Sequence, residues 1–408
     1  MPTQDNITNR DYPFKLGLIS GALPPAPFAQ AVVLDRLLKD VPADNYCLVT
    51  HQPGRKASRE LPEAGRLPGR YFILKEPFHL PLVKGITLPQ ITINTLWGIF
   101  RRARQIEAIA RQEHLTVLIA CTANLYDIPA AYLVGSRLNI PFIPYVFDYF
   151  SYQWTGFFRF FSKRMESAIF PKAHKVLVTN KCMGDEYRRV YGIECPVIFN
   201  PCSIPDLSHL DMTGPVFPSE GIHIVFAGTV YHAHFDAFRN FIASLKKMGR
   251  DDTFLHIFTP QARSELEKNG ICGPMIRYHQ SVSHTEILSV LRKADILYLP
   301  LAFDSPIPEV IMTASPGKTG EYLSVGRPIL VHAPKGSFIS SYFSENGCGV
   351  VVDRNDIQQL SAGLKKIIDD EGFRRDISTR ARVMAERDFS AAEGSRRFLA
   401  LLRQTGDQ

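Results

Sequence analysis

The segment from Ser315 to Leu330 carries the clearest chemical pattern in the sequence, a Pro/Gly-rich loop that opens a short helix and leads into a strand. The first amides of such a helix are unpaired and partly positive, so the backbone of Gly317, Lys318 and Thr319 could hold a phosphate. The Lys318 ammonium adds a cation at the same end. Glu321, one turn further on, is placed to accept hydrogen bonds from a ribose diol. The pattern is therefore suited to a phosphate and a ribose, the parts of a nucleotide.

The segment from Ser315 to Leu330 has two other interpretations. Gly317-Lys318-Thr319 could end a phosphate-binding P-loop, but that motif requires a glycine at position 312, where the sequence has Met312. A plain loop-to-helix junction with a solvated Lys318 and Glu321 is the structural alternative. No Gly-x-Gly-x-x-Gly pattern follows any predicted strand, which argues against a dehydrogenase.

The elements that must position these residues alternate along the whole sequence, because short apolar runs ending at turn residues are followed by segments of helical period. In the first half the pattern predicts strands at 14–20, 46–50, 70–74, 117–121, 142–147 and 176–179, and helices at 28–39, 96–113, 128–138, 151–170 and 183–191. In the second half it predicts strands at 222–227, 253–258, 276–279, 296–300, 328–332 and 349–352, with helices at 235–248, between the later strands, and from 357 to 402.

A break between the halves is marked by a cluster of turn-forming residues without apolar periodicity: Pro201, Pro205, Gly214, Pro215 and Pro218. Strands regularly separated by helices form parallel sheets covered on both faces. We therefore predict an α/β protein with two Rossmann-like, doubly wound domains that face a cleft, comprising residues 1–205 and 206–388. A C-terminal helix, 389–408, is expected to pack back on the first domain.

The composition is that of a folded, soluble protein. Of the 408 residues, 45% are hydrophobic and 21% charged, and no run approaches the roughly 18 apolar residues of a membrane helix. The sequence begins Met1-Pro-Thr-Gln-Asp-Asn, which lacks the layout of a signal peptide. The seven cysteines form no Cys-x-x-Cys pair, so neither a disulfide framework nor a zinc site is supported. We expect a cytoplasmic protein.

The net charge of +7 lies on the first half. Residues 1–205 carry 24 basic and 16 acidic residues, whereas residues 206–408 carry 23 and 24. Such a surplus could meet anionic lipid or an acidic substrate, or it could be a solvated surface that aids solubility. The charge is spread and no zinc-finger, helix-turn-helix or RNA-recognition signature is present, so we expect no nucleic-acid partner.

Several segments resemble glycosyltransferase family 4-like enzymes, whose fold is called GT-B. Their signature P-x-K-x-x-E-Y-L-x-x-G-x-P-I-L is matched at Lys318, Glu321-Tyr322-Leu323, Gly326 and Pro328-Ile329-Leu330. In the same order as in the family, similar segments occur at Gly21–Pro27 (the Gly/Pro loop after the first strand), Val197–Pro201 (V-I-x-N-P), Phe226–Thr229 (F-x-G) and Ala294–Pro300 (A-D-x-x-x-x-P). The resemblance covers most of the chain and is densest in residues 222–352.

This resemblance implies roles for individual residues of the second domain. Glu321 would bind the ribose of the donor, and Lys318 would neighbour its diphosphate together with the 317–320 backbone. Gly228 and Thr229 would line the other side of the same cleft, and the loop containing Glu309 would cover the transferred sugar. Eleven residues separate Glu309 from Glu321, where many family members have seven between two glutamates.

The resemblance also implies candidates where the sequence departs from the family. An Arg and a Lys often follow F-x-G in the family, but this chain has Tyr231-His232-Ala233-His234-Phe235. His232 or His234 could donate to phosphate instead, while a surface-loop position is the alternative for His234.

In the first domain, Gly21 is a further candidate donor-binding residue. Tyr145–Tyr149 resembles the family's H-D strand end, with Phe147 in place of the histidine. Asp148 is then a candidate catalytic residue with Glu309, or alternatively the N-cap of the helix 151–170. Asp127 is interpreted as a cap of the helix that follows it.

The resemblance further implies transfer from a nucleoside diphosphate sugar, with UDP or GDP as the nucleotide, to a saccharide or lipid-linked saccharide, with retention of the anomeric configuration. Fixed amides and Lys318 would stabilise the charge that builds on the leaving diphosphate without a metal or cofactor, and the sequence has no Asp-x-Asp motif.

The acceptor would bind to the first domain. The basic, aromatic segments 96–106 and 152–164 in that domain could contact a lipid-linked acceptor at the anionic inner membrane face. Alternatively, their apolar residues form an ordinary core-facing stripe.

Two alternatives to a transferase were kept open. A sugar-nucleotide 2-epimerase has the same double-sheet architecture, but it needs several carboxylates and histidines around the sugar, and few carboxylates lie near the predicted cleft. A non-catalytic carbohydrate-binding or partner subunit is suggested by Phe147 and by the departures at 231–235.

Overall fold

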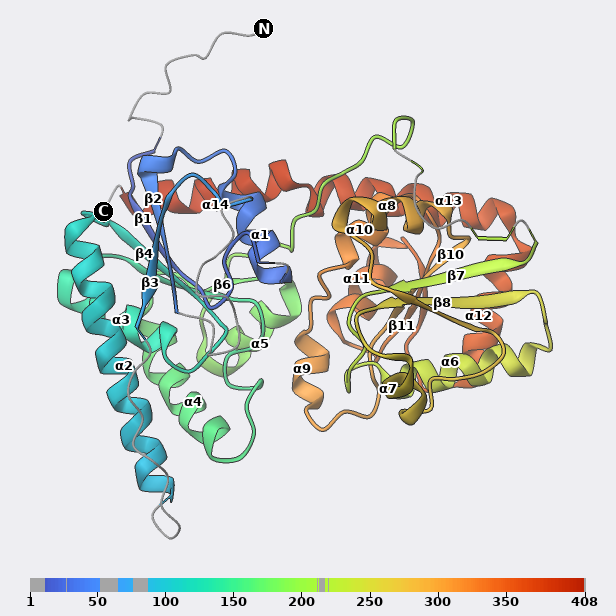
Figure 1. Ribbon diagram of the computed structural model, residues 1–408, viewed down its shortest axis with the longest axis horizontal. Helices are drawn as coiled ribbons and strands as arrows, with labels where there is room; N and C mark the ends of the chain where they lie inside the picture. Colours follow the sequence, from blue (N-terminus) through green and yellow to red (C-terminus); the bar gives the residue numbers. More distant parts are fainter. Residues whose placement is uncertain are drawn as a thin grey trace, which may run out of the picture. The chain divides into compact units, whose positions relative to one another are not determined.

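The computed structural model describes residues 12–26, 28–51, 65–75, 87–210, 212, 217–218 and 220–406. The chain divides into two compact units, residues 1–199 with 394–408, and residues 200–393. Each unit contains one six-stranded sheet, and helices cover both faces of each sheet (Figure 1). The predicted α/β class with two Rossmann-like sheets is confirmed. Of the turn-forming residues predicted between the halves, Gly214 and Pro215 lie outside the described residues.

The sheet of the first unit has the strand order β3-β2-β1-β4-β5-β6, and its paired strands are parallel. The strands are β1 (Leu16–Ile19), β2 (Tyr46–His51), β3 (Arg70–Leu74), β4 (Val117–Cys121), β5 (Phe142–Val146) and β6 (Leu177–Val178). The helices are α1 (Ala29–Leu38), α2 (Thr87–Gln112), α3 (Asp127–Leu138), α4 (Gly156–Ile169) and α5 (Lys181–Tyr191), joined by the end of α14 (Ala391–Gly406).

Alternate residues of these strands face two different helical layers, as the period of two of a strand requires. On one face Leu16, Leu18 and Ile119 pack with α1 and with Phe398 and Leu402 of α14. On the other face the intervening strand residues pack with α2, α3 and α5. Because both faces of the inner strands are buried, these strands are nearly continuous apolar runs, which is why the sequence located them, whereas the edge strand β3 is partly exposed.

The second unit repeats this plan with the order β12-β11-β10-β7-β8-β9. Its strands are β7 (Ile222–Ala227), β8 (Thr253–Thr259), β9 (Ile276–Gln280), β10 (Ile296–Pro300), β11 (Ile329–His332) and β12 (Val350–Val352). Its helices are α6 (Phe235–Met248), α7 (Arg263–Lys268), α8 (His284–Lys293), α9 (Pro308–Thr313), α10 (Thr319–Ser324), α11 (Phe338–Asn346), α12 (Ile357–Asp369) and α13 (Glu371–Met384), which is followed by a π-helical turn, Ala385–Phe389.

In each unit the strand order reverses beside the first strand, between β1 and β4 and between β7 and β10. The connections that leave two such neighbouring strands run to opposite faces of the sheet. A crevice opens at their carboxyl ends, and ligands of open parallel sheets bind there. The fold thus predicts where a site within each unit belongs before any side chain is considered.

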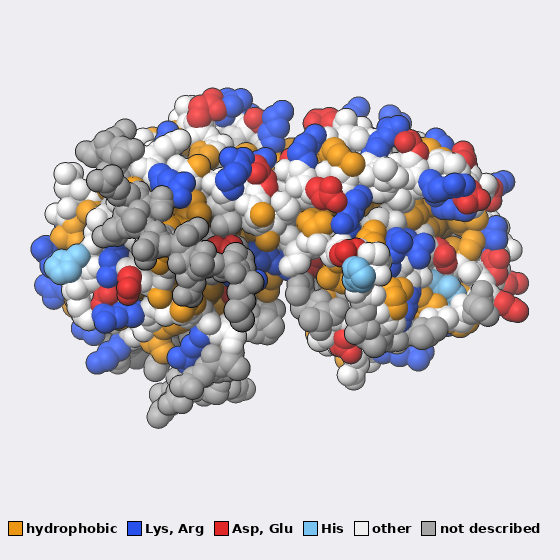
Figure 2. Space-filling view, turned by 90° about the horizontal axis from the view of Figure 1, so that it is seen from above, with side chains coloured by type: hydrophobic (Ala, Val, Ile, Leu, Met, Phe, Trp, Pro, Cys, Tyr) orange, Lys and Arg blue, Asp and Glu red, His pale blue; other side chains and the backbone are white. Residues whose placement is uncertain are grey.

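Two general sequence expectations can be compared with the surface and the helices. On the face seen in Figure 2, Lys and Arg side chains are interspersed with acidic ones over both units, in line with a spread charge. None of the described helices is both long and apolar enough to cross a membrane.

A chain of three histidines crosses the second sheet on neighbouring strands. His223 on β7 lies with its Nδ1 3.0 Å from Nε2 of His256 on β8, and His256 Nδ1 lies 2.9 Å from Nε2 of His279 on β9. His223 Nε2 lies 2.9 Å from the carbonyl oxygen of Pro218, which only accepts hydrogen bonds. With neutral rings, Nε2 of each histidine donates, and Nδ1 of His223 and of His256 accepts.

These three histidines make the free energy of unfolding depend on pH. Burial, followed by the charges of His279 and His223, lowers the pKa of His256 to about 3, whereas the unfolded chain takes up the proton near pH 6.5. The folded state therefore keeps its full stability above pH 6.5 and loses it as the pH falls towards 3. With allowance for partial solvation, we expect a loss of about 1 kcal/mol at pH 5, seen as a lower thermal midpoint.

The matched variant for this prediction is His256→Gln. Glutamine offers one donor and one acceptor to His223 and His279 but does not titrate. Its thermal midpoint should depend less steeply on pH between 6.5 and 4 than that of the unmodified protein, and equal slopes would contradict the role given to His256.

Candidate functional site

In the second unit, the place where ligands of open parallel sheets bind is flanked by the segments that follow β7 and β10. Gly228, Thr229 and His232 are in the segment after β7, whereas Glu309 and Lys318 are in the connection after β10. Five of the predicted site residues, four for donor binding and the catalytic candidate Glu309, therefore follow neighbouring strands of one sheet. The structure also shows how two of them come into contact.

Helix α10 is fastened to the end of β7 by one buried hydrogen bond. The backbone amide of Ala227 donates to the hydroxyl of Tyr322, a fully buried residue of α10, over 2.8 Å. This bond holds α10 beside the last residue of β7. Lys318, immediately before α10, places its Nζ 3.7 Å from the centroid of the Phe226 ring on β7, in a cation–π contact.

Gly228 leaves the space that the Lys318 side chain occupies. A Cβ atom at Gly228 would lie 3.1 Å from Lys318 Nζ and 3.2 Å from Cε. The residue also has a φ of +131°, which residues with a side chain rarely adopt. Its amide donates to the carbonyl of Phe258 over 2.9 Å. A glycine is thus required at this position for two independent reasons, backbone conformation and contact with the ammonium.

The ammonium of Lys318 is held where it is poorly hydrated. Burial lowers the pKa of Lys318 to about 7, and the nearby carboxylate of Glu321 acts in the opposite direction. A cation in such a place gains strongly from an anionic ligand, because the ligand replaces the missing hydration.

The segment before α10 differs from the sequence prediction. The helix begins at Thr319 rather than near residue 317, and the amide of Thr319 donates to the carbonyl of Pro316 over 3.0 Å. Pro316, Gly317, Lys318 and Thr319 therefore form a turn, and one of the amides expected to face a phosphate is already engaged. The Thr319 hydroxyl is buried and has no hydrogen-bond partner among the described residues.

Gly320 faces other segments of its own unit rather than open space. A Cβ atom there would lie 2.9 Å from Cys202 Sγ and 3.1 Å from Phe389 Cβ. The glycine therefore allows α10 to pack closely against two distant segments of its own unit. The preceding loop is held by Asn200, whose amide nitrogen donates to the Ser315 carbonyl over 3.0 Å.

The two histidines of the segment after β7 differ in their surroundings. Thr229 and His232 are exposed. The surface-loop alternative for His234 was wrong, because this residue is only 4% exposed and lies edge-on to the rings of Phe226 and Tyr231. Its Nδ1 has no partner among the described residues. Burial, followed by the charges of Lys318 and His232, holds the pKa of His234 well below its usual range, so the ring is neutral.

Asp236 is a residue of this site that the sequence did not reveal. Its Oδ2 accepts hydrogen bonds from the amides of Phe303 and Asp304, each at 2.8 Å. The amide of Ala302 also donates to the carbonyl of Ala233 over 2.7 Å. The segments after β7 and β10 are thus tied together, and the second leads to α9, where Glu309 is the second residue and half-buried.

The two candidates of the first unit lie at the carboxyl edge of its own sheet. Gly21 follows β1, and a Cβ atom there would lie 2.9 Å from Ala123 Cβ and 3.2 Å from His51 Cε1. Asp148 follows β5, its side chain is exposed, and its amide lies 3.3 Å from the Thr122 hydroxyl, which accepts the bond. Helix α4 begins only at Gly156, so the N-cap interpretation of Asp148 was wrong.

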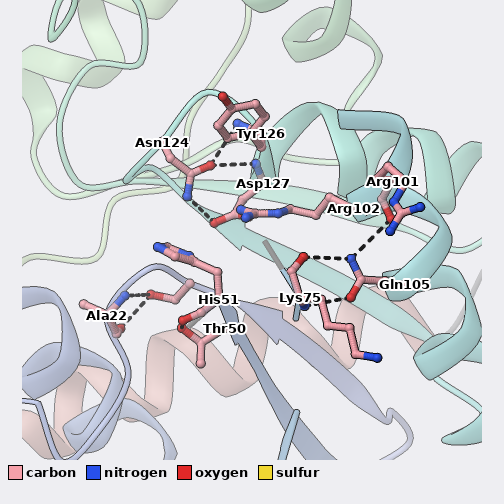
Figure 3. A network of polar contacts seen from close by, with 11 residues as sticks. Ala22, Thr50, His51, Lys75, Arg101, Arg102, Gln105, Asn124, Tyr126 and Asp127 are labelled. Atoms are coloured by element: carbon pink, nitrogen blue, oxygen red, sulfur yellow. Dashed lines mark hydrogen bonds and ion pairs between the residues drawn. The ribbon is translucent and has the colours of Figure 1, made fainter. Parts of the chain in front are cut away.

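Asp127 does not cap a helix either, as Figure 3 shows. The side chain of Asn124 accepts hydrogen bonds from the amides of Tyr126 (2.8 Å) and Asp127 (3.0 Å) and so performs the capping function. The Asp127 carboxylate instead pairs with Arg102, and both side chains are buried. The pair fastens α3 to α2.

A buried glutamate fixes the chain just after Asp148. Glu166 on α4 accepts from the amide and hydroxyl of Ser151 (2.9 and 3.1 Å) and from the hydroxyls of Tyr187 (3.4 Å) and Tyr191 (2.7 Å). Burial raises the pKa of Glu166 to about 7, and the hydrogen bonds oppose that rise.

The described residues contain no group of three or more His, Cys, Asp or Glu side chains placed to hold a metal ion.

Comparison with protein families gives one match, within the second unit. Residues 240–384 match the family described as "Glycosyl transferases group 1". The matched region contains α9, Lys318 and α10. A search of curated proteins finds no match.

Solved structures of the same fold cover nearly the whole chain. HepE of Anabaena, in complex with UDP and glucose, is 11% identical, with a TM-score of 0.64 over 96% of this chain and 99% of its own. A UDP-forming α,α-trehalose-phosphate synthase of Burkholderia xenovorans, in complex with glucose-6-phosphate, is 14% identical, with a TM-score of 0.65 over 95% and 100%. A Listeria monocytogenes protein assigned as a UDP-N-acetylglucosamine 2-epimerase is 13% identical, with a TM-score of 0.57 over 96% of each chain. At such identities these structures establish the fold.

Proposed function

Because the protein is a glycosyltransferase with the GT-B fold, we propose that it moves a sugar from a nucleoside diphosphate sugar, bound by the second unit, to a saccharide or lipid-linked saccharide. The observation that carries the donor site is Lys318, a poorly hydrated ammonium between the Phe226 ring and the backbone of Gly228. It lies at the crevice where ligands of parallel sheets bind.

In this proposal each residue at the crevice has a chemical task. Lys318 stabilises the negative charge that builds on the leaving diphosphate, together with the backbone amide of Gly317 and the Thr319 hydroxyl, which has no hydrogen-bond partner in the described part of the chain. Glu321 binds the ribose diol. His234, neutral and buried, offers a hydrogen bond rather than a positive charge. A stabilised leaving group needs no metal, and we propose a retaining, metal-independent reaction.

The residues that contact the transferred sugar are proposed from their positions after the strands of each sheet. Glu309, on α9, follows the segment that Asp236 fixes, and we propose that it faces the sugar. Asp148 and Gly21 lie at the carboxyl edge of the first sheet, and we propose that they act with the acceptor and donor there. UDP and GDP are the donor nucleotides we expect.

The experiment that tests the donor site is a thermal-shift panel of UDP, GDP, ADP, CMP and dTDP. A nucleotide that binds only the folded protein stabilises it by about 2.7 kcal/mol at a hundredfold excess over its Kd. We expect UDP or GDP to raise the thermal midpoint, and Glu321→Ala to abolish the rise. Glu345→Ala, at an exposed glutamate of α11, is the matched control. No rise with any of the five nucleotides would remove the basis of the proposal.

The same preparation separates the alternatives. Release of nucleoside diphosphate that requires an acceptor identifies a transferase, whereas consumption of a UDP-N-acetylhexosamine without acceptor identifies an epimerase. Nucleotide binding with neither reaction identifies a non-catalytic subunit. The fold does not distinguish the two reactions, since a protein assigned as an epimerase shares it. The match to the glycosyl transferase group 1 family favours transfer.

We further propose a cytoplasmic protein that touches the anionic inner face of the membrane through its first unit. Helices α2 and α4 there expose Leu96 (54%), Trp97 (47%) and Phe160 (57%). Arg101 lies 6.0 Å from the Trp97 ring, and Arg164 lies 4.8 Å from the Phe160 ring. Aromatic side chains beside cations suit the interface between headgroups and acyl chains. Trp154, Phe161 and Met165 of the expected stripe pack instead against the core.

Co-sedimentation with phosphatidylglycerol vesicles tests this contact. We expect binding that falls with added salt, and a loss of about tenfold in the double variant Trp97→Ser/Phe160→Ser, because two exposed aromatic side chains no longer enter the interface. Val383→Ser, at an exposed apolar residue of the second unit, serves as control. The absence of binding to anionic vesicles would count against membrane contact and would leave the donor site unaffected.

A further inference from the structure

A groove of about 710 Å³ lies in the second unit at the amino edge of its sheet. Ile222, at the start of β7, Ile296, at the start of β10, and Pro328, just before β11, line one wall, and residues of α12 and α13 line the other. These elements can be followed in Figure 1. Gly228 and Lys318 lie at the opposite, carboxyl edge, and no residue assigned above to the donor site lines the groove.

The lining is strongly basic, with five arginines and two carboxylates. Three of the arginines are held by backbone carbonyl oxygens. Arg292 Nη1 donates to Val325 O over 3.1 Å, Arg327 Nε to Arg292 O over 2.6 Å, and Arg374 Nη1 to Ile367 O over 2.8 Å. Carbonyl oxygens orient a guanidinium without neutralising it, and these three arginines form no ion pair within the described part of the chain.

The remaining charges do not cancel this surplus. Arg375 pairs with Glu371 over 3.1 Å, and Arg382 pairs with Glu386 over 2.9 Å, each within one helix turn near the surface, where ion pairs are weak. Asp295, the other lining carboxylate, accepts from the amide of His223 over 2.8 Å. Five arginines, three of them held by backbone carbonyl oxygens, thus line a recess with two carboxylates.

We propose that this groove is a second ligand site, which binds a soluble compound bearing two or more phosphate groups. The fixed guanidinium groups present paired N–H donors that match phosphate oxygens. The apolar wall of Ile222, Ile296 and Ile368 suits the organic part of such a compound. The recess lies between two helices and the strand starts and is open to solvent on one side, which fits a compact soluble ligand. The proposal does not depend on the proposed function of the donor site.

The test uses inorganic tripolyphosphate as probe, titrated calorimetrically into the full chain carrying Lys318→Met, so that the ammonium at the carboxyl edge does not contribute. We expect one binding event. Adding Ser378→Asp, which brings a carboxylate into the groove, should weaken it by at least about tenfold. Ser378→Asn has nearly the same shape without the charge and should bind as before.

A second variant is expected to bind tripolyphosphate more tightly, a result that misfolding cannot produce. Glu371→Gln removes a carboxylate that lines the groove and pairs with the exposed Arg375, and it should tighten tripolyphosphate binding severalfold. Sodium sulfate at equal ionic strength should not replace the probe. The proposal is overturned when Lys318→Met binds no tripolyphosphate, or when Ser378→Asp and Ser378→Asn bind it equally.

Discussion

Replacing Lys318 by methionine is expected to lower kcat/KM for glycosyl transfer by about 10³, the effect of removing one fixed group that stabilises developing negative charge. Methionine keeps the length of the side chain and its contact with the Phe226 ring, but not the charge. Because the ammonium is held beside Gly228 with little hydration, solvent cannot replace it. Lys335→Met, at an exposed lysine after β11, should leave kcat/KM unchanged. A Lys318→Met variant that retains a tenth of the activity would contradict the assignment.

The pH profile provides a second test of Lys318. Since the pKa of Lys318 in the free protein is about 7, kcat/KM should fall as the pH rises above 7, by about tenfold per pH unit. Lys318→Arg should lose activity, because the Phe226 ring and the Gly228 backbone leave little room for a guanidinium. Its residual activity should not fall above pH 7, since arginine stays protonated. A profile unchanged by the arginine would mean that another group titrates.

The inner strands were predictable because the chain buries them on both faces, so they are apolar runs in the sequence. All twelve predicted strands are present with ends that agree within two residues, although the edge strands β3 and β9 are partly exposed and β9 is mostly polar. The strand order was not readable from the sequence itself, since apolar runs do not say which strands pair. The α/β alternation favoured doubly wound sheets, and the resemblance to a known family implied the GT-B fold.

Helix starts were predicted less well, for reasons that lie in tertiary contacts. The helix expected from Ser151 begins at Gly156 because the preceding residues form turns, with Tyr149 and Tyr152 stacked at 4.0 Å between ring centroids. Helix α10 begins at Thr319 because the amide of that residue bonds to Pro316. Neither event has a local sequence signal stronger than the helical pattern around it.

The candidate site shows the same division between local and distant information. The sequence located Lys318 and Gly228 near strand ends, but their contact depends on the bond between Tyr322 and Ala227, ninety-five residues apart. The burial of His234 depends on packing against Phe226 and Tyr231. The arginines of the amino-edge groove are scattered between residues 292 and 382, and no local pattern connects them.

Asp236 was missed because an acidic residue in the first turn of a helix is ordinary and favourable on its own. Its partners, the amides of Phe303 and Asp304, are 67 and 68 residues away. Asp236→Ala should remove the acceptor of both amides and destabilise the second unit by about 3 kcal/mol. Calorimetric unfolding would measure this as a lower thermal midpoint.

The same variant should also lower kcat/KM by about 10², because a shift of the segment leading to α9 misplaces the groups proposed to meet the sugar. Asp236→Asn keeps one oxygen that can accept both bonds, so it should lose only about 1 kcal/mol and most of its activity should remain. Asp251→Ala, at an exposed aspartate after α6, is the control for removal of a carboxylate. If Asp236→Ala loses stability but keeps full kcat/KM, the segment after β10 supports the fold without positioning the sugar. If neither quantity changes, the two amides find another acceptor and Asp236 has no part in the site.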